Sequence, residues 1–347
     1  MDVLVTVFED RSDAFPGVQL ALAGLRRHLP GVPVELIRPG VTGAERRWLD
    51  ARPGVSLVDR SFDARGWDAK PAVLLAALEH AEDVVWWDSD LLATADLAPV
   101  LPAAPPDGLV ATEETFWGQE QGTGHRSRAW GLTTSRVLPT TVNTALLRVG
   151  PRHRPLLRAW QDLLASPTYR AAQARPAEQR PLHLLGDQEV LTALLESRRF
   201  AGERLHLLRR GATVAQCFGP AGFTVAERVR ALAHGSGPSI VHAMGVKPWT
   251  VLPWPPGGGL PRSRETAPWR RFYARLHAEL SPYTVAAAQY RDELSDPAWV
   301  DSHSPWAARA RLGRRRNPVV ADELLLAAAD SAVRRARRSL GIGRFSR

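Results

Sequence analysis

The 347-residue sequence contains a single cysteine and only two lysines, and it has no apolar run approaching the length that spans a bilayer. One cysteine excludes an internal disulfide and a cysteine-based zinc site, and it is typical of proteins from a reducing compartment. A membrane-spanning helix needs roughly 20 apolar residues in a row, so we expect no such segment. The first residues also lack a basic leader followed by a long apolar stretch, so we expect no signal peptide and a cytoplasmic protein.

The shortage of lysine is notable because the chain has 45 basic residues, of which all but Lys70 and Lys247 are arginine. Each of the two lysines precedes a proline. In so arginine-rich a chain, a lysine indicates a place where a planar guanidinium cannot replace a compact ammonium. We therefore expect both lysines to be functional.

The formal net charge of +9 is concentrated near the end of the chain. Residues 309–347 carry eleven arginines and three acidic residues, a balance of +8, which leaves +1 for the rest. Nucleic-acid-binding proteins usually spread a basic face over their fold, so we expect no nucleic acid partner. We interpret residues 301–347 as an arginine-rich linker and a basic amphipathic helix, which suits peripheral contact with an anionic membrane at its inner face. The alternative, which we favour over membrane contact, is a solvated or partly disordered tail.

Residues 1–300 have the pattern of one α/β domain. Apolar runs at 2–8, 32–37 and 55–58 predict strands, and helical spacing at 18–29 and 71–80 predicts helices between them. Alternating strands and helices indicate a parallel sheet. Further strands are expected at 84–87, 141–149 and 239–242, and further helices at 155–165, from 186 onward and at 269–280. Residues 112–134 show no clear periodicity and are interpreted as a long acceptor or lid loop, and 168–180 as a surface segment.

Two carboxylates follow the most apolar of these runs. Asp88 and Asp90 come directly after Val84–Trp87, and if the chain stays extended through Ser89 they point to the same side. They then lie beyond the carboxyl end of a buried strand, where open α/β sheets bind ligands. Two such oxygens suit Mn²⁺ or Mg²⁺. The alternative is a turn in which the aspartates cap whatever follows.

Several segments, taken in chain order, resemble glycosyltransferase family 8, which includes glycogenin and the bacterial lipopolysaccharide galactosyl- and glucosyltransferases. The resemblance covers roughly residues 1–250 and rests on a first strand near Thr6, Lys70, Trp86-Trp87-Asp88-Ser89-Asp90, Asn143-Thr144-Ala145, Gly186-Asp187-Gln188, and His242 to Trp249. Ala145 stands where the family usually has glycine. The spacing from His242 to Lys247 is one residue shorter than the family pattern.

The resemblance implies a GT-A fold, a Rossmann-like domain that binds a nucleotide-diphosphate sugar, usually of uridine. It implies that Asp88, Asp90 and His242 bind Mn²⁺, with Mg²⁺ as the alternative, although an imidazole is less natural for Mg²⁺. The remaining roles divide between the two ends of the donor. The nucleotide and diphosphate are assigned to Thr6, Asp88, Gly245 and Lys247, and the donor sugar and catalysis to Lys70, Asn143, Asp187 and Gln188.

Two of these residues have ordinary structural explanations as well. Asp187 suits the N-cap of a helix, and an isolated His242 is usually a satisfied core or surface histidine. No side chain stands out as a nucleophile. The sequence as a whole predicts a metal-dependent retaining glycosyltransferase that moves a hexose from a UDP-sugar to a glycan, a lipid-linked or a small-molecule acceptor. The alternatives are a catalytically inactive nucleotide-sugar-binding protein of this fold and, less favoured, a nucleic-acid-binding protein that acts through the arginine tail.

Overall fold

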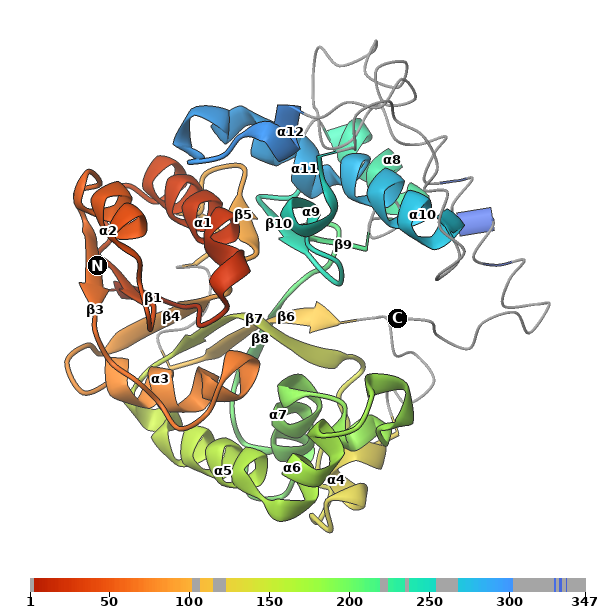
Figure 1. Cartoon of the computed structure of the whole chain (residues 1–347). Coiled ribbons are helices and arrows are strands. Elements are labelled where there is room, and N and C mark those ends of the chain that lie inside the picture. Colours follow the sequence, from red (N-terminus) through yellow and green to blue (C-terminus); the bar gives the residue numbers. More distant parts are fainter. Residues whose placement is uncertain are drawn as a thin grey trace.

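The computed structural model describes residues 3–101, 107–114, 123–218, 224–234, 237–253 and 268–301, with isolated positions at 328, 331, 332 and 335 (Figure 1). The expected basic tail therefore lies almost wholly outside the described residues. Within the described part of the chain, no helix has the length and apolar character needed to cross a membrane.

A seven-stranded sheet forms the centre of the molecule, with the strand order β3-β2-β1-β4-β7-β6-β8. Only β7 runs antiparallel to its neighbours in this sheet, pairing with β4 on one side and β6 on the other. The predicted α/β fold with a mostly parallel central sheet is confirmed. In chain order the strands are β1 Val3–Phe8, β2 Val34–Ile37, β3 Val55–Val58, β4 Asp83–Trp87, β6 Leu109–Glu114, β7 Thr141–Val149 and β8 Leu205–Leu208.

Strand β4 is buried on both faces, as its unbroken apolar sequence predicts. Val84 and Trp86 belong to the core beneath one face of the sheet, and Val85 and Trp87 to the core on the other. Helices α1 (Phe15–His28) and α2 (Gly43–Asp50) cover the latter face, while α3 (Lys70–Ala77), α5 (Arg154–Ala165), α6 (Pro167–Gln173) and α7 (Asp187–Glu196) cover the former (Figure 1). Because both faces of β4 are packed, the position and direction of the strand are fixed, and so is the starting point of the segment that carries Asp88 and Asp90.

A second, three-stranded sheet has the order β5-β10-β9, from β5 Leu91–Ala93, β9 Val214–Cys217 and β10 Ile240–Ala243. Strand β10 runs antiparallel to β5, with His242 paired to Leu91. The pairing joins a segment just beyond β4 to one about 150 residues later, and it sets His242 beside the predicted aspartates. A third core packs against this sheet, with Leu92, Val241 and Tyr283 all buried.

The later helices lie on the same side of the molecule as this small sheet (Figure 1). They are α8 Val225–His234, α9 Pro248–Val251, α10 Pro268–Glu279, α11 Pro282–Ala287 and α12 Ala298–Asp301.

Two segments for which the sequence predicted no helix or strand contain regular elements. The expected loop at 112–134 begins inside β6 and includes α4 (His125–Ala129), while residues 115–122 lie outside the described part. The expected surface segment at 168–180 contains most of α6, whose Tyr169 is fully buried. Its hydroxyl donates a 2.7 Å hydrogen bond to Asp68. Because Asp68 lies 101 residues before Tyr169, the local sequence pattern could not predict this contact.

Candidate metal centre

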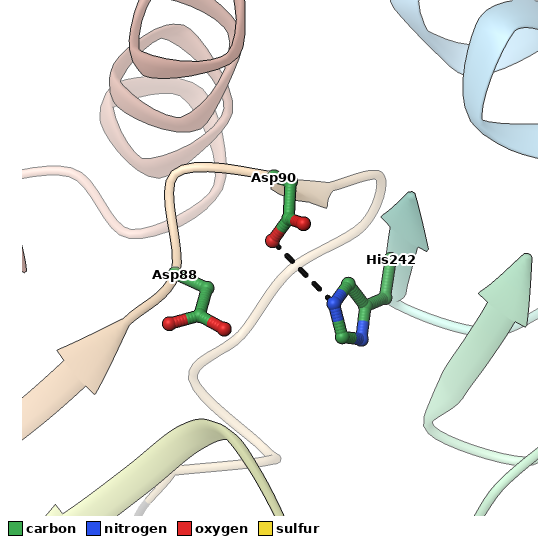
Figure 2. A group of neighbouring side chains, drawn as sticks. All are labelled: Asp88, Asp90 and His242. Atoms are coloured by element: carbon green, nitrogen blue, oxygen red, sulfur yellow. Dashed lines mark ion pairs between the residues drawn. The ribbon is translucent and has the colours of Figure 1, made fainter. Parts of the chain in front are cut away.

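The two aspartates lie in a turn rather than in an extended continuation of β4. Strand β4 ends at Trp87, and the amide of Leu91 donates a 3.0 Å hydrogen bond to the carbonyl of Asp88. The condition of extended backbone through Ser89 is therefore not met, because Ser89 and Asp90 form a turn that leads directly into β5. The turn nevertheless brings both carboxylates toward the same point (Figure 2).

Asp88, Asp90 and His242 form a group with the composition of a metal site. One potential ligand atom from each lies within 4.8 Å of the others. The His242 Nε2 atom lies 3.4 Å from Asp90 Oδ1, and both residues are 6% exposed (Figure 2). Two carboxylates and an imidazole fit a divalent ion such as Mn²⁺. The structure brings the three predicted ligands close together, and the pairing of β5 with β10 sets His242 beside the turn that carries the aspartates.

Lys70 lies at the other side of the aspartate pair. Its Nζ atom is 3.1 Å from Asp88 Oδ1 and 3.5 Å from Asp187 Oδ2, and it donates to Thr144 Oγ1 at 3.0 Å. Burial acts to lower the pKa of this ammonium, but the Asp187 and Asp88 carboxylates outweigh burial and raise it. Lys70 is thus a buried, fully paired cation between the first aspartate and the first residue of α7.

Lys247 pairs with Asp90, as Lys70 pairs with Asp88. Its Nζ atom contacts Asp90 Oδ2 and donates a 2.6 Å hydrogen bond to the carbonyl of Ala243. Burial acts to raise the pKa of Asp90, but Lys247 and His242 hold it well below its ordinary value. Burial also raises the pKa of Asp88. Each aspartate of the group is therefore paired with one of the chain's two lysines.

Asp187 is the first residue of α7 and is 5% exposed. Gly186, not Asp187, is the N-cap, so the N-cap explanation of Asp187 does not apply. Its carboxylate accepts a 2.6 Å hydrogen bond from Thr144 Oγ1, and its carbonyl accepts a 3.0 Å bond from Trp160 Nε1. A carboxylate at a helix N-terminus is also favoured by the helix dipole.

The side chains of Gln188 and Asn143 form a chain of hydrogen bonds beneath this cluster. Asn143 Nδ2 donates to Gln188 Oε1 at 3.3 Å and to Glu114 Oε2 at 3.2 Å. Gln188 Nε2 donates to Glu189 Oε1 at 3.3 Å. The Gln188 amide is thereby held from both ends.

Glu189 was not identified from the sequence. It is 1% exposed, and burial raises the pKa of its carboxyl to about 8. Thr144 was missed too, although it lies between Asn143 and Ala145 in a segment that was singled out. A threonine inside a strand carries no distinguishing signal, because its partners on α3 and α7 are distant in sequence.

The two remaining predicted residues have different positions. Thr6 is fully buried in β1 opposite Trp86, and its hydroxyl has no hydrogen-bond partner among the described residues. Its nucleoside contact stays a prediction. Gly245 is exposed and has a φ of +73°, a backbone conformation that favours glycine.

Glu9, just beyond β1, accepts a 2.5 Å hydrogen bond from Ser89 Oγ, and thereby ties the end of β1 to the aspartate turn.

No protein-family model matches the sequence, and a search of curated proteins finds no relative. Solved structures similar to the chain include the galactosyltransferase LgtC in complex with donor and acceptor sugar analogs, at 14% identity over 84% of this chain and 100% of that one, with a TM-score of 0.48. The bifunctional glycosyltransferase WbbM matches at 14% identity over 71% of this chain, with a TM-score of 0.47. The match covers 46% of WbbM, so this chain corresponds to about half of that protein.

A third similar structure is the glycosyltransferase GlyE of Streptococcus pneumoniae, at 14% identity over 84% of this chain and 63% of that one, with a TM-score of 0.41. Each of these three likenesses concerns the fold alone.

Proposed function

We propose that this protein is a metal-dependent glycosyltransferase that moves a hexose from a nucleotide-diphosphate sugar, with UDP-sugar as the donor and retention of anomeric configuration. We assign the activity to residues 1–300 and place the chain with glycosyltransferase family 8 and its GT-A fold. The acceptor class is a glycan, a lipid-linked or a small-molecule hydroxyl compound.

The observation that carries this proposal is the convergence of three carboxylates, two ammonium groups and an imidazole at the end of β4. Asp88 and Asp90 come from the turn after β4, His242 from β10 and Asp187 from α7. Such a mixture of charges suits an anionic ligand that arrives together with a divalent cation, as a nucleoside diphosphate does. A purely structural role explains it poorly, because buried charges are costly even when they are paired.

Transfer requires that the diphosphate leaves while positive charge develops at the anomeric carbon. Asp88, Asp90 and His242 would hold Mn²⁺, which neutralises negative charge on the departing diphosphate. Lys247 supplies a second positive charge on the same side of the site, and Gly245 allows close approach of the backbone. The two aspartates act only as ligands in this proposal.

The donor sugar is assigned to the other half of the cluster. Lys70 and Asp187 are paired with each other and with Thr144, so their hydrogen-bonding groups are fixed before a ligand arrives. Groups fixed in this way lower the ordering cost of binding a sugar hydroxyl, which can take over one of the hydrogen bonds that Lys70 and Asp187 make. We assign Gln188, whose amide is held between Asn143 and Glu189, to the face of the sugar at the anomeric carbon.

Calorimetric titration of UDP with and without Mn²⁺ tests the proposal, using the native chain, Asp90→Asn and the exposed control Asp162→Asn on α5. We expect metal-dependent binding that Asp162→Asn retains and Asp90→Asn loses, with transfer from UDP-sugars reduced by orders of magnitude in Asp90→Asn. Unchanged turnover of Asp90→Asn would refute the metal site. Metal-dependent UDP binding with no transfer from any UDP-hexose to water or sugar acceptors would instead favour the catalytically inactive alternative.

A further inference from the structure

Both oxygens of the Asp90 carboxylate already have partners. Oδ1 lies 3.4 Å from His242 Nε2, and Oδ2 contacts Lys247 Nζ. The side chain of Asp90 is 8% exposed, so solvent screens the interactions of its charge only weakly. A divalent ion bound by Asp90 and His242 has to share the carboxylate with an ammonium group, and two cations on one buried carboxylate repel each other.

The ammonium groups of the two lysines differ in how many contacts hold them to the aspartates. Lys70 has a side chain 5% exposed, with Asp88, Asp187 and Thr144 around its ammonium group. Lys247 has a side chain 17% exposed, and its ammonium contacts only Asp90 and one carbonyl among the described residues.

The backbone before Lys247 is also more exposed than the backbone around Lys70, which lies between the buried residues Ala69 and Pro71. Lys247 follows the exposed residues Gly245 and Val246, and Gly245 has a positive φ. Lys247 itself has extended backbone at the N-cap of the four-residue helix α9. The ammonium can therefore move off Asp90 without breaking a second side-chain contact.

The charge balance indicates what has to accompany that movement. Asp88, Asp90 and Asp187 provide three negative charges, and the two lysines provide two positive ones. A divalent ion alone reverses the sign of the site and leaves the displaced ammonium without an anionic partner. A diphosphate supplies negative charge to both the metal and the ammonium.

We propose that Lys247 competes with the metal for Asp90 and so couples metal binding to diphosphate binding. This inference rests on the proposed function. Without nucleotide, Lys247 occupies the Asp90 oxygen and weakens binding of the free metal. With a nucleoside diphosphate, Lys247 transfers to the phosphate oxygens, and Asp90 becomes available to the metal.

The test measures Mn²⁺ binding alone, by electron paramagnetic resonance, to the native chain, Lys247→Met and Arg170→Met. The last variant removes one exposed positive charge from α6 and is the control for net charge. We expect Lys247→Met to bind free Mn²⁺ roughly tenfold more tightly than the native chain, a coupling of ordinary size, and Arg170→Met to bind as the native chain does. Circular dichroism establishes folding, and Lys247→Gln replaces Lys247→Met if the latter does not fold.

A second arm measures UDP affinity at saturating Mn²⁺, where Lys247→Met should bind more weakly than the native chain. The two effects have opposite signs, which a general structural disturbance does not produce. Equal or weaker binding of free Mn²⁺ by the lysine variant overturns the competition, even if UDP binding by the native chain upholds the proposed function. Absence of UDP binding by the native chain refutes the proposed function, while the free-metal arm still decides the competition. Absence of Mn²⁺ binding by every protein overturns both.

Discussion

Glu189→Gln is the substitution that most directly examines the buried polar layer beneath the candidate site. Gln has nearly the same shape as Glu, and its carbonyl oxygen can still accept the hydrogen bond that Gln188 Nε2 donates to Glu189 Oε1. The substitution therefore removes the ionisation of the side chain while it keeps the packing. Any change in stability with pH then reports on the carboxyl group.

The expected magnitude follows from the pKa of the native side chain. Burial raises the pKa of Glu189 from 4.5 to about 8, although the nearby Arg126 acts to lower it. A pKa raised by folding means that the folded state holds a proton that the unfolded state has released, so the contribution is fully present below pH 4.5 and is lost as pH rises through 8. The free energy of unfolding then falls by about 1.4 kcal/mol for each pH unit in this window. Over the whole window the loss is at most about 5 kcal/mol.

Urea denaturation followed by circular dichroism at pH 5, 6, 7 and 8 provides the measurement. The native chain and Glu189→Gln should have similar free energies of unfolding at pH 5. The variant should become progressively more stable than the native chain, by about 2–4 kcal/mol at pH 8. Asp162→Asn, an exposed charge removal, should not reproduce this divergence. Parallel pH curves for the native chain and Glu189→Gln would refute the argument, because they would mean that Glu189 is ionised in the folded state at neutral pH.

Two further substitutions address the other hydrogen bonds around the site. Thr144→Val removes the hydroxyl shared by Lys70 and Asp187, and it should lower the free energy of unfolding by about 1–3 kcal/mol, since two buried charged groups each lose a partner. Urea denaturation measures this loss, and Thr144→Ser should restore most of it. Tyr169→Phe removes the hydrogen bond to Asp68, whose pKa burial raises to about 6. Because the phenol favours the ionised carboxylate, the destabilisation should be about 1–2 kcal/mol at pH 8 and smaller at pH 5, and equal losses at both pH values would contradict this explanation.

Much of the fold was predictable because its elements have strong local patterns. The strand at Val55–Val58 has the predicted boundaries, and β7 occupies Thr141–Val149 as expected. The helices α3, α5 and α7 begin within one residue of their predicted starts. In each of these segments the apolar spacing matches the period of one secondary structure, and proline or glycine marks a boundary.

The parts that escaped prediction depend on partners far away in the chain. Strand β5 has only three residues, Leu91–Ala93, and it exists because β10 pairs with it. The turn at residues 88–91 leads directly into this strand. The contact between Asp90 and Lys247 joins residues 157 positions apart. Local periodicity contains no information about pairings of this range.

The structure brings the predicted site residues close together, and the geometry around Lys70 shows how a lysine differs from an arginine at this position. Its ammonium has oxygen atoms from Asp88, Asp187 and Thr144 at distances of 3.0–3.5 Å. These oxygens come from the turn after β4, from α7 and from β7, and they surround one point instead of lining one edge. A compact ammonium can donate to three oxygens arranged in this way, whereas a planar guanidinium directs its donors within one plane and needs more room. In an arginine-rich chain, a position that arginine cannot fill therefore identifies a small, enclosed group of anionic and hydroxyl oxygens before any tertiary contact is known.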